Sequence, residues 1–212
     1  GIVTYGANEM IPRVAKEVGF TGMLFGVWNP SSEEEFAIAK ASAQNEIVLG
    51  FVVGNEGLDE RYDSETLKQA IEKLSQATGK PVTTTEQHTD YSNPRLLELG
   101  DWVFPNTHPY FHRFIDPVEA AAWTERQYKK LASKTKKPVL FKEVGLPSEG
   151  DEGLSEQAQA EYYRQLQQTS VHFVYFEAFD QLWKTHLPVE PHWGLFRSDR
   201  TPKWVVKYLP QK

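Results

Sequence analysis

The stretch FVVGNEGLDE, from Phe51 to Glu60, passes from apolar residues into Gly-Asn-Glu and then into a polar segment. An apolar, β-branched run that stops at Gly and Asn is typical of a buried strand ending in a turn. Glu56 therefore stands at the end of a buried strand. A carboxylate in that position can cap the next helix, pair with a surface lysine or take part in chemistry, and the other strands decide between these roles.

Similar apolar runs recur along the chain and alternate with helical patterns, which is typical of βα units and a parallel sheet. We expect strands at 2–5, 23–27, 48–53, 82–85, 102–104, 139–141 and 173–176. Between them, Leu67, Ile71 and Leu74 recur at helical spacing and predict one apolar stripe that faces the sheet. Helix-capping signals occur at Ser31, Ser32, Asp116-Pro117 and Gly79.

The composition is that of a globular protein with a single domain, residues 1–212. Apolar residues make up 40% of the chain, and no run approaches the roughly 18 apolar residues that a membrane span needs. The 29 acidic and 23 basic side chains give a net charge of −6, which disfavours a nucleic-acid partner. Cysteine is absent, so disulfides and thiolate chemistry are excluded and the compartment is left open.

Residues capable of chemistry follow nearly every expected strand. They are Tyr5, Trp28, Asn55-Glu56, Glu86, His108 with Tyr110, Glu143, and Glu177 with Asp180. An open parallel sheet binds its ligand at one switch point, whereas a closed barrel brings all its strand ends to one mouth. The spread over all the strands favours a (β/α)8 TIM barrel, with seven strands present and one βα unit missing.

Glu56 and Glu143 are two candidate carboxylates that come shortly after apolar strands and could share a barrel mouth. Two carboxylates about 5 Å apart can hydrolyse a glycoside with retention, one as the nucleophile and the other as acid and then base. Such a pair alone is a weak signal, because carboxylates at barrel mouths also bind metals and polar substrates.

Four segments in order, VVGNE, KPVLFKEVGLPSEG, FEAFDQLWK and EPHWGLF, resemble glycoside hydrolase family 17, the β-1,3-glucanase family, especially its bacterial branch. The resemblance extends over essentially the whole chain. It implies a retaining (β/α)8 glycosidase in which Glu56 is the acid/base and Glu143 the nucleophile. It also implies a β-glucan oligosaccharide or polysaccharide as the substrate, and no cofactor.

The same resemblance implies several sugar-binding residues. Asn55 would bind the sugar 2-hydroxyl, Tyr5 would line the site near the nucleophile, and Tyr110 would donate to Glu143, with His108 supporting that geometry. Further expected contacts are Trp28, Glu86, Trp183, Lys184, Glu190 and Trp193. Trp28 and Trp193 can equally be packing residues, and Glu86 can bind a sugar hydroxyl or keep Glu56 protonated. Glu177 is charged where plant members tend to carry a small apolar residue, which can alter a subsite.

No metal site is expected. The His108 to His112 spacing contains Pro109, which disfavours the helix that would place both rings on one face. By comparison with the family, the chain begins at barrel strand two. A barrel without its first strand exposes two edges. Three explanations are open: the missing residues were left out, another segment or a partner chain fills the gap, or the fold is a reduced barrel. The first two are favoured.

The leading hypothesis is hydrolysis of β-1,3-glucan through a covalent glucosyl-enzyme. The alternatives are a β-1,3-glucanosyltransferase, a non-catalytic glucan-binding barrel, and a related glycosidase acting on mannan or cellulose. A secreted or periplasmic location is the expectation that accompanies these functions.

Overall fold

The computed structural model describes residues 1–6 and 8–210. These form two compact units. The described residues of the first lie within 1–105 and 135–140, and those of the second lie within 106–134 and 141–210. Each unit contains its own parallel sheet.

The sheet of the first unit has four strands in the order β1-β2-β3-β4. They are β1 (Ile2–Tyr5), β2 (Met23–Val27), β3 (Val48–Val53) and β4 (Val82–Thr84). All three pairings are parallel, with Phe25 opposite Phe51 and Phe51 opposite Val82. Strands that follow one another in chain order and run parallel are the arrangement expected of successive βα units.

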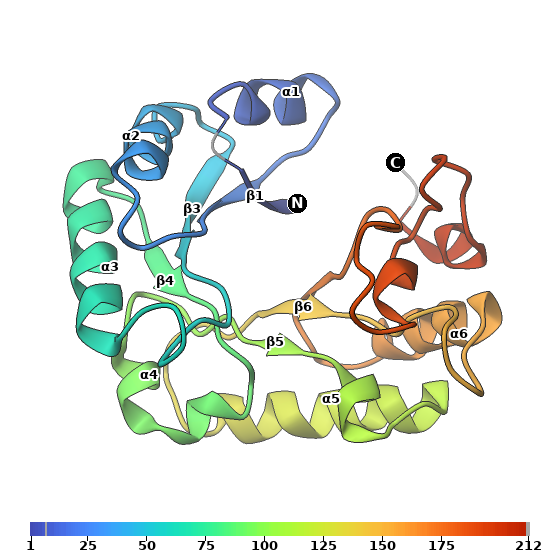
Figure 1. Ribbon diagram of the computed structural model, residues 1–212. Coiled ribbons are helices and arrows are strands. Elements are labelled where there is room, and N and C mark those ends of the chain that lie inside the picture. Colours follow the sequence, from blue (N-terminus) through green and yellow to red (C-terminus); the bar gives the residue numbers. More distant parts are fainter. Residues whose placement is uncertain (7, 211–212) are drawn as a thin grey trace. The chain divides into compact units, whose positions relative to one another are not determined.

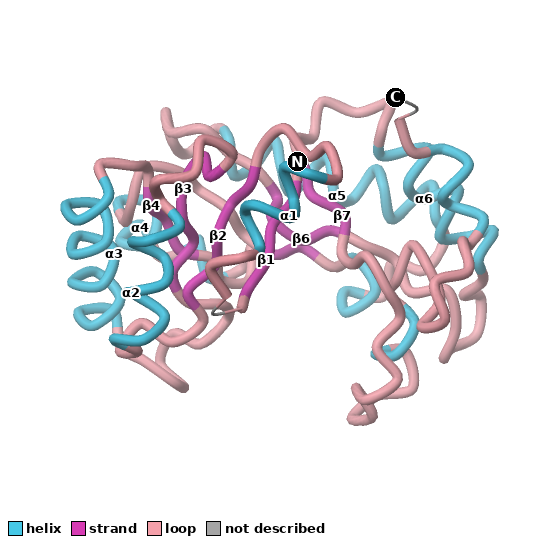
Figure 2. Tube along the Cα trace, turned by 90° about the horizontal axis from the view of Figure 1, so that it is seen from above, coloured by secondary structure: helices cyan, strands magenta, loops and turns pink. Residues whose placement is uncertain are grey.

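The helices of the first unit are α1 (Ile11–Glu17), α2 (Glu33–Ser42), α3 (Ser64–Thr78) and α4 (Pro94–Glu98), with the 3₁₀ helix η1 at Asp90–Ser92. Figures 1 and 2 show α2 and α3 side by side along one face of the sheet. The Ser32 cap of α2 is confirmed, because its side chain accepts from the N–H of Glu35. The Gly79 cap of α3 is also confirmed, at φ 64° in the left-handed region.

The core of the first unit lies between the sheet and these helices. Leu67, Ile71 and Leu74 of α3 are buried, as their spacing predicts, and they belong to the same cluster as Phe25 and Phe51. The stripe therefore fixes α3 against the sheet and leaves its polar residues on the outer side.

The second unit has the parallel sheet β5-β6-β7. Its strands are β5 (Asn106–Thr107), β6 (Phe141–Val144) and β7 (Phe173–Tyr175). Its helices are α5 (Pro117–Ala132) and α6 (Glu156–Leu166), with the 3₁₀ helices η2 (Pro109–His112), η3 (Glu190–His192) and η4 (Trp204–Tyr208). Asp116 caps α5 as expected, accepting from the N–H groups of Val118 and Glu119.

Two expected strands lie further along the chain than predicted. Instead of a strand at 102–104 there is a single bridge between Val103 and Val139, and β5 follows it at Asn106–Thr107. β6 begins at Phe141 rather than at 139, and it includes Glu143 within the strand. The apolar runs marked the approach to each strand, whereas the hydrogen-bonded ladder continues into the polar residues.

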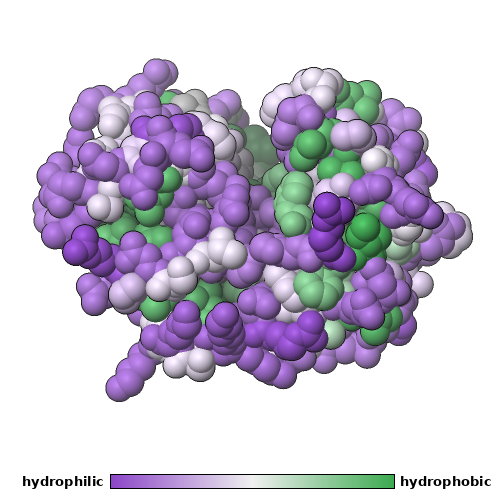
Figure 3. All heavy atoms as spheres, turned by 60° about the horizontal axis from the view of Figure 1, so that its bottom comes forward, coloured by the Kyte–Doolittle hydropathy of each residue, from purple (hydrophilic) through white to green (hydrophobic). Residues whose placement is uncertain are grey.

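The molecular face in Figure 3 is predominantly hydrophilic, with scattered apolar patches. Among the described residues, no helix combines the length and apolar character that crossing a membrane would require.

Candidate active site

Glu56 lies in a sharply turned segment that directly follows β3. The Gly54 N–H donates to the Val27 carbonyl at 2.8 Å, and the Glu56 N–H donates to the Thr85 carbonyl at 3.0 Å. Gly54 has φ +77°, and Glu56 itself has φ 47°, a left-handed conformation that a non-glycine residue rarely adopts. Backbone of this kind is held by its surroundings and clusters at functional sites. Here the ends of β2 and β4 supply the hydrogen bonds that hold it.

A buried tyrosine and a buried carboxylate hold this turn through hydrogen bonds. The Tyr62 hydroxyl accepts from the Gly57 N–H at 3.1 Å and donates to Glu86 Oε1 at 2.8 Å. Glu86 Oε2 accepts from the Leu58 N–H at 3.3 Å. Burial raises the pKa of Glu86 and the pKa of Tyr62. With 1% of its surface exposed, Glu86 serves this network, and its carboxylate presents almost no surface to a sugar hydroxyl.

An aromatic and cationic cluster lies on the other side of the turn. The Tyr5 hydroxyl donates to the Gly54 carbonyl at 2.9 Å, and its ring packs edge-on to Trp28 with centroids 5.6 Å apart. Trp28 is 45% exposed, and the Arg61 guanidinium lies 4.4 Å from its ring centroid. Arg61 also donates to the Asn55 carbonyl. Arg61 and Tyr62 were missed in the sequence, where only their position shortly after NEG could have indicated a role.

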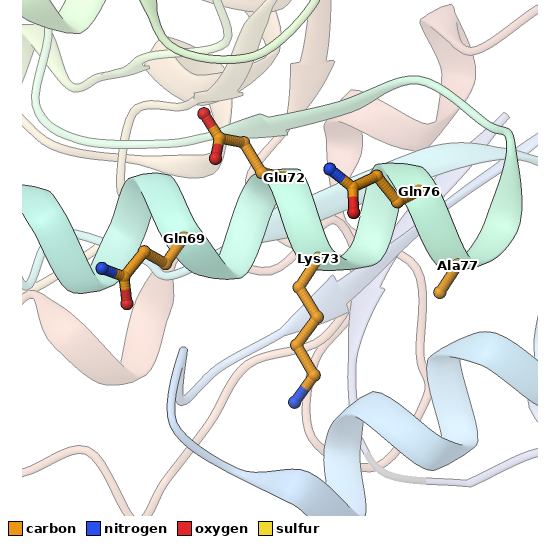
Figure 4. A pocket seen from close by; sticks show the side chains of 5 residues that line it. All are labelled: Gln69, Glu72, Lys73, Gln76 and Ala77. Atoms are coloured by element: carbon orange, nitrogen blue, oxygen red, sulfur yellow. The ribbon is translucent and has the colours of Figure 1, made fainter.

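A pocket in the first unit opens beside Glu56. Its lining is mostly polar and acidic, and comprises Glu56, Leu58, Asp59, Glu60, Glu86, Gln87, Thr89, Asp90, Ser92, Asn93 and Leu96. A second hollow, shown in Figure 4, is lined by Gln69, Glu72, Lys73, Gln76 and Ala77. All five belong to α3 and none to a strand end, so we assign no function to that hollow.

Glu143 lies in β6 of the second unit, where the strand is irregular. Phe141 pairs with Phe173 and Val144 with Tyr175, so β6 carries one more residue than β7 over this interval. Such a bulge changes the direction in which a side chain points. Lys142 Nζ contacts Glu143 Oε1, and His108 Nε2 lies 3.5 Å from Glu143 Oε2.

The electrostatic surroundings keep Glu143 ionised. Burial by itself raises its pKa, but the charge of Lys142 and the hydrogen bond and charge of His108 outweigh it and lower the pKa from its ordinary value of 4.5 to about 2. The side chain of Lys142 is 1% exposed and that of Glu143 is 17% exposed, so solvent screens the pair little.

His108 follows β5 and packs within an aromatic cluster. Its ring centroid lies 4.9 Å from that of Trp193 and 5.3 Å from that of Phe176. Trp193 is only 1% exposed, so its ring is covered by protein and acts here as packing beneath His108. The expectation that Tyr110 donates to Glu143 is wrong, because its single hydroxyl proton is donated to Asp151 at 2.9 Å. Lys142 and His108 take that place.

Two further carboxylates follow β7. Glu177 accepts from Lys184 Nζ at 2.7 Å, and both side chains are about 15% exposed. Burial raises the pKa of Glu177, with the charges of Glu143 and Glu190 adding to the rise and Lys184 opposing it. Glu190 lies 3.6 Å from His186. Trp183 is 74% exposed and is therefore open to contact from solvent.

A buried ion pair that the sequence did not reveal fixes this loop. Lys203 Nζ contacts Asp180 Oδ1 at 2.6 Å and Ser148 Oγ at 2.7 Å, and Asp180 Oδ1 also accepts from the Gly194 N–H. Burial lowers the pKa of Lys203. The pair ties the segment after β6 to the segment after β7 and to the C-terminal residues.

Parallel α/β sheets with carboxylates at or after their strands are the arrangement found in glycoside hydrolases of the TIM-barrel type. The chain belongs to the BtgE/BtgC glycoside hydrolase domain family, part of glycoside hydrolase family 17, whose model matches residues 2–194. The family and the fold class expected from the sequence are confirmed. The expectations for a single domain and for a missing first βα unit stay predictions.

Curated relatives and solved structures agree with this family. The chain is 30% identical over 207 residues to a probable β-glucosidase btgE of Aspergillus flavus, covering 88% of this chain and 34% of the relative. It is 26% identical over 228 residues to a probable glucan endo-1,3-β-glucosidase btgC of Aspergillus clavatus, covering 86% of this chain and 32% of that protein. The chain thus spans about a third of the length of these relatives.

Among solved structures, a family 17 β-1,3-glucanosyltransferase from Rhizomucor miehei has a TM-score of 0.80 at 22% identity, covering 96% of this chain and 84% of that chain. An active-site mutant of the Rhizomucor miehei enzyme, solved with laminaritriose, has a TM-score of 0.79 at 23% identity over the same shares of the two chains. At these identities the likeness concerns the fold.

Proposed function

We propose that this chain is the catalytic domain of a retaining enzyme that cleaves β-1,3-glucosidic bonds. The observation that carries the proposal is the environment of Glu143, a carboxylate held ionised by Lys142 and His108 in a parallel strand. A nucleophile for glycosyl transfer has to be ionised when the substrate binds. The second carboxylate in the proposal is Glu56, supported by the resemblance of VVGNE to the family's acid/base motif.

In the first step, a Glu143 oxygen attacks the anomeric carbon while the bond from that carbon to the leaving oxygen breaks. Glu56 gives its proton to the leaving oxygen. In the second step, an acceptor hydroxyl loses its proton to Glu56 and attacks the anomeric carbon, and the bond to Glu143 breaks. Retention requires the two carboxyl groups to be about 5 Å apart when the sugar is bound.

Glu56 suits the acid/base role because its left-handed turn is fixed by main-chain hydrogen bonds and adjoins a polar pocket. Asn55 is proposed to bind the sugar 2-hydroxyl, with its main chain steadied by Arg61. Tyr5 and Trp28 are proposed to line the same side, with Trp28 offering an exposed ring for stacking.

In the second unit, Lys184 and Glu190 are proposed sugar contacts, and Trp183 a stacking surface because its ring is 74% exposed. Tyr110 is proposed to contribute to sugar binding through its ring and through its hydroxyl, which donates to Asp151. Direct stacking on Trp193 and direct sugar binding by Glu86 are left out of the proposal, since each residue is 1% exposed.

Water and a second glucan compete as the acceptor. Both hydrolysis and transfer occur among the names of similar proteins. The btgC protein of Aspergillus clavatus is a probable glucan endo-1,3-β-glucosidase, and the Rhizomucor miehei enzyme is a β-1,3-glucanosyltransferase. Transfer would lengthen part of a laminari-oligosaccharide pool, whereas hydrolysis would only shorten it.

The test is product analysis with laminari-oligosaccharides for the wild-type protein, Glu143→Gln and Glu56→Gln. We expect loss of turnover in both variants and first products of the β-anomeric form by NMR. Normal turnover in both variants would refute the two roles. Laminarin binding without turnover in the wild-type protein would instead indicate a glucan-binding module.

A further inference from the structure

The bulge in β6 brings two consecutive charged side chains into contact. Successive residues of a regular strand point to opposite faces, so neighbours such as Lys142 and Glu143 would normally diverge. The extra residue between Phe141 and Val144 breaks that alternation. As a result the Lys142 ammonium reaches Glu143 Oε1 while its side chain remains 1% exposed.

We propose that Lys142 is a positioning residue that shortens the life of the covalent glycosyl-enzyme, because the attraction between its buried ammonium and the Glu143 carboxylate is lost when Glu143 becomes an ester. The inference rests on the proposed function, in which Glu143 is the nucleophile. It concerns the balance between the two chemical steps rather than the identity of the nucleophile.

The electrostatics of the ester support this role. On attack, the carboxylate oxygen forms a bond to the anomeric carbon and its negative charge disappears, as it does on protonation. A nearby opposite charge favours the ionised carboxylate over a neutral form, so the contact with Lys142 disfavours the ester. Release of the sugar returns the electron pair to Glu143 and restores the ion pair. The ammonium therefore favours the free enzyme over the intermediate.

Other charged groups around Glu143 modify this balance. His108 Nε2 lies 3.5 Å from the second carboxylate oxygen and acts in the same direction as Lys142. Glu177, beyond β7, is within electrostatic range of Glu143 and acts in the opposite direction, but its Oε1 is engaged by Lys184 at 2.7 Å. Lys142 is the cation in direct contact with Glu143 Oε1.

The size of the effect on the intermediate follows from comparing the ester of Glu143 with its protonated acid. An opposite charge at contact distance lowers a carboxyl pKa by roughly 1 to 3 units. Since a neutral ester resembles a neutral acid, each unit corresponds to about tenfold in the equilibrium between intermediate and free enzyme. Replacing Lys142 by an uncharged residue should raise the occupancy of the intermediate by at least about tenfold.

The experiment uses Lys142→Met, whose unbranched side chain fills similar space without charge. The probe is a 2,4-dinitrophenyl laminaribioside, whose leaving group needs no acid, and its 2-deoxy-2-fluoro analogue, which traps the ester. We expect Lys142→Met to show a burst of dinitrophenol that the wild-type protein lacks. We also expect the pH below which the rate of trapping declines, the acid limb of its pH profile, to move upward by roughly 1 to 3 pH units.

Two controls separate charge from packing. Lys137→Met removes a lysine whose Nζ donates to the carbonyls of Glu98 and Gly100 rather than to Glu143, so the burst and the acid limb should not change. Because the chain has no cysteine, Lys142→Cys alkylated with 2-bromoethylamine during refolding restores an ammonium at this position alone. The restored ammonium should abolish the burst.

The outcomes are distinguishable. If the fluoro-sugar does not label Glu143 in the wild-type protein, the proposed function fails. If it labels Glu143 but Lys142→Met keeps the wild-type acid limb and shows no burst, the role of Lys142 is refuted and the function stands. If Lys142→Met does not fold, the wild-type protein still decides: trapping that already declines below roughly pH 4 would contradict an ion pair at Glu143.

Discussion

The Tyr62 hydroxyl connects the turn that bears Glu56 to the buried Glu86, accepting from the Gly57 N–H and donating to Glu86 Oε1 at 2.8 Å. One phenol oxygen thus satisfies a main-chain donor and a buried carboxylate together. The two groups belong to segments that follow neighbouring strands, β3 and β4.

Tyr62→Phe tests this connection. It leaves the Gly57 N–H and one oxygen of Glu86 without that partner, and an unsatisfied buried polar group costs about 1–3 kcal/mol. We expect the free energy of unfolding in urea to fall by about that amount, and turnover to fall because the Glu56 turn loosens. Tyr208→Phe is the matched control, since Tyr208 is 45% exposed, and it should change neither quantity.

Gly54→Ala should distort the same turn. A Cβ at Gly54 would overlap the Tyr62 hydroxyl, and φ +77° is unfavourable for alanine. Gly79→Ala shares the positive φ, at 64°, but its Cβ would have no atom within 4 Å. We therefore expect Gly54→Ala to lower the thermal midpoint more than Gly79→Ala, measured by circular dichroism. Equal losses would mean that backbone strain alone matters at Gly54.

The stability of the protein should depend on the ionisation of Glu143. Because the folded-state pKa is lowered from 4.5 to about 2, the stabilisation is complete above about pH 4.5 and is lost as the pH falls toward 2. Wild-type protein should exceed Glu143→Gln by about 1–3 kcal/mol at pH 6, with the difference shrinking between pH 4.5 and 2. Urea unfolding across this range measures it, and a constant difference would contradict the lowered pKa.

Lys203→Met should be among the more destabilising substitutions in the second unit. It leaves Asp180 buried without its cation, and breaking a buried pair from one side costs about 3–5 kcal/mol. Adding Asp180→Asn should recover part of that loss, because the uncompensated charge is then removed. A double-mutant cycle by urea denaturation checks this, and strictly additive losses would exclude a coupled pair.

Much of the first unit could be predicted because its signals are local. Apolar periodicity located β1 to β3 and the buried stripe of α3, and Ser32 and Gly79 cap helices as their residue types indicate. In the second unit, the strand predicted at 139–141 differs from the observed β6. Lys142 and Glu143 belong to β6, whereas the alternation rule places a charged pair after a strand. No local rule signals a bulge of this kind.

The site residues divide in the same way. Glu56 and Glu143 stand out because a carboxylate after an apolar run is unusual. The supporting residues do not stand out in the sequence, because their roles depend on partners from other parts of the chain that come close only in the folded protein. These residues are Tyr62, Arg61 and Lys203. Tyr110 was assigned the wrong partner because several hydroxyl acceptors were compatible with its position in the sequence.

The extra residue that β6 carries relative to β7 makes the chemistry sensitive to chain length at that point. Only Lys142 and Glu143 lie between Phe141 and Val144, so deleting one residue there would let the strand pair evenly with β7 but would remove either the ammonium or the carboxylate. A shortened protein of this kind would keep a sheet and lose one member of the ion pair, so homologues aligned with a gap here are unsafe guides to activity.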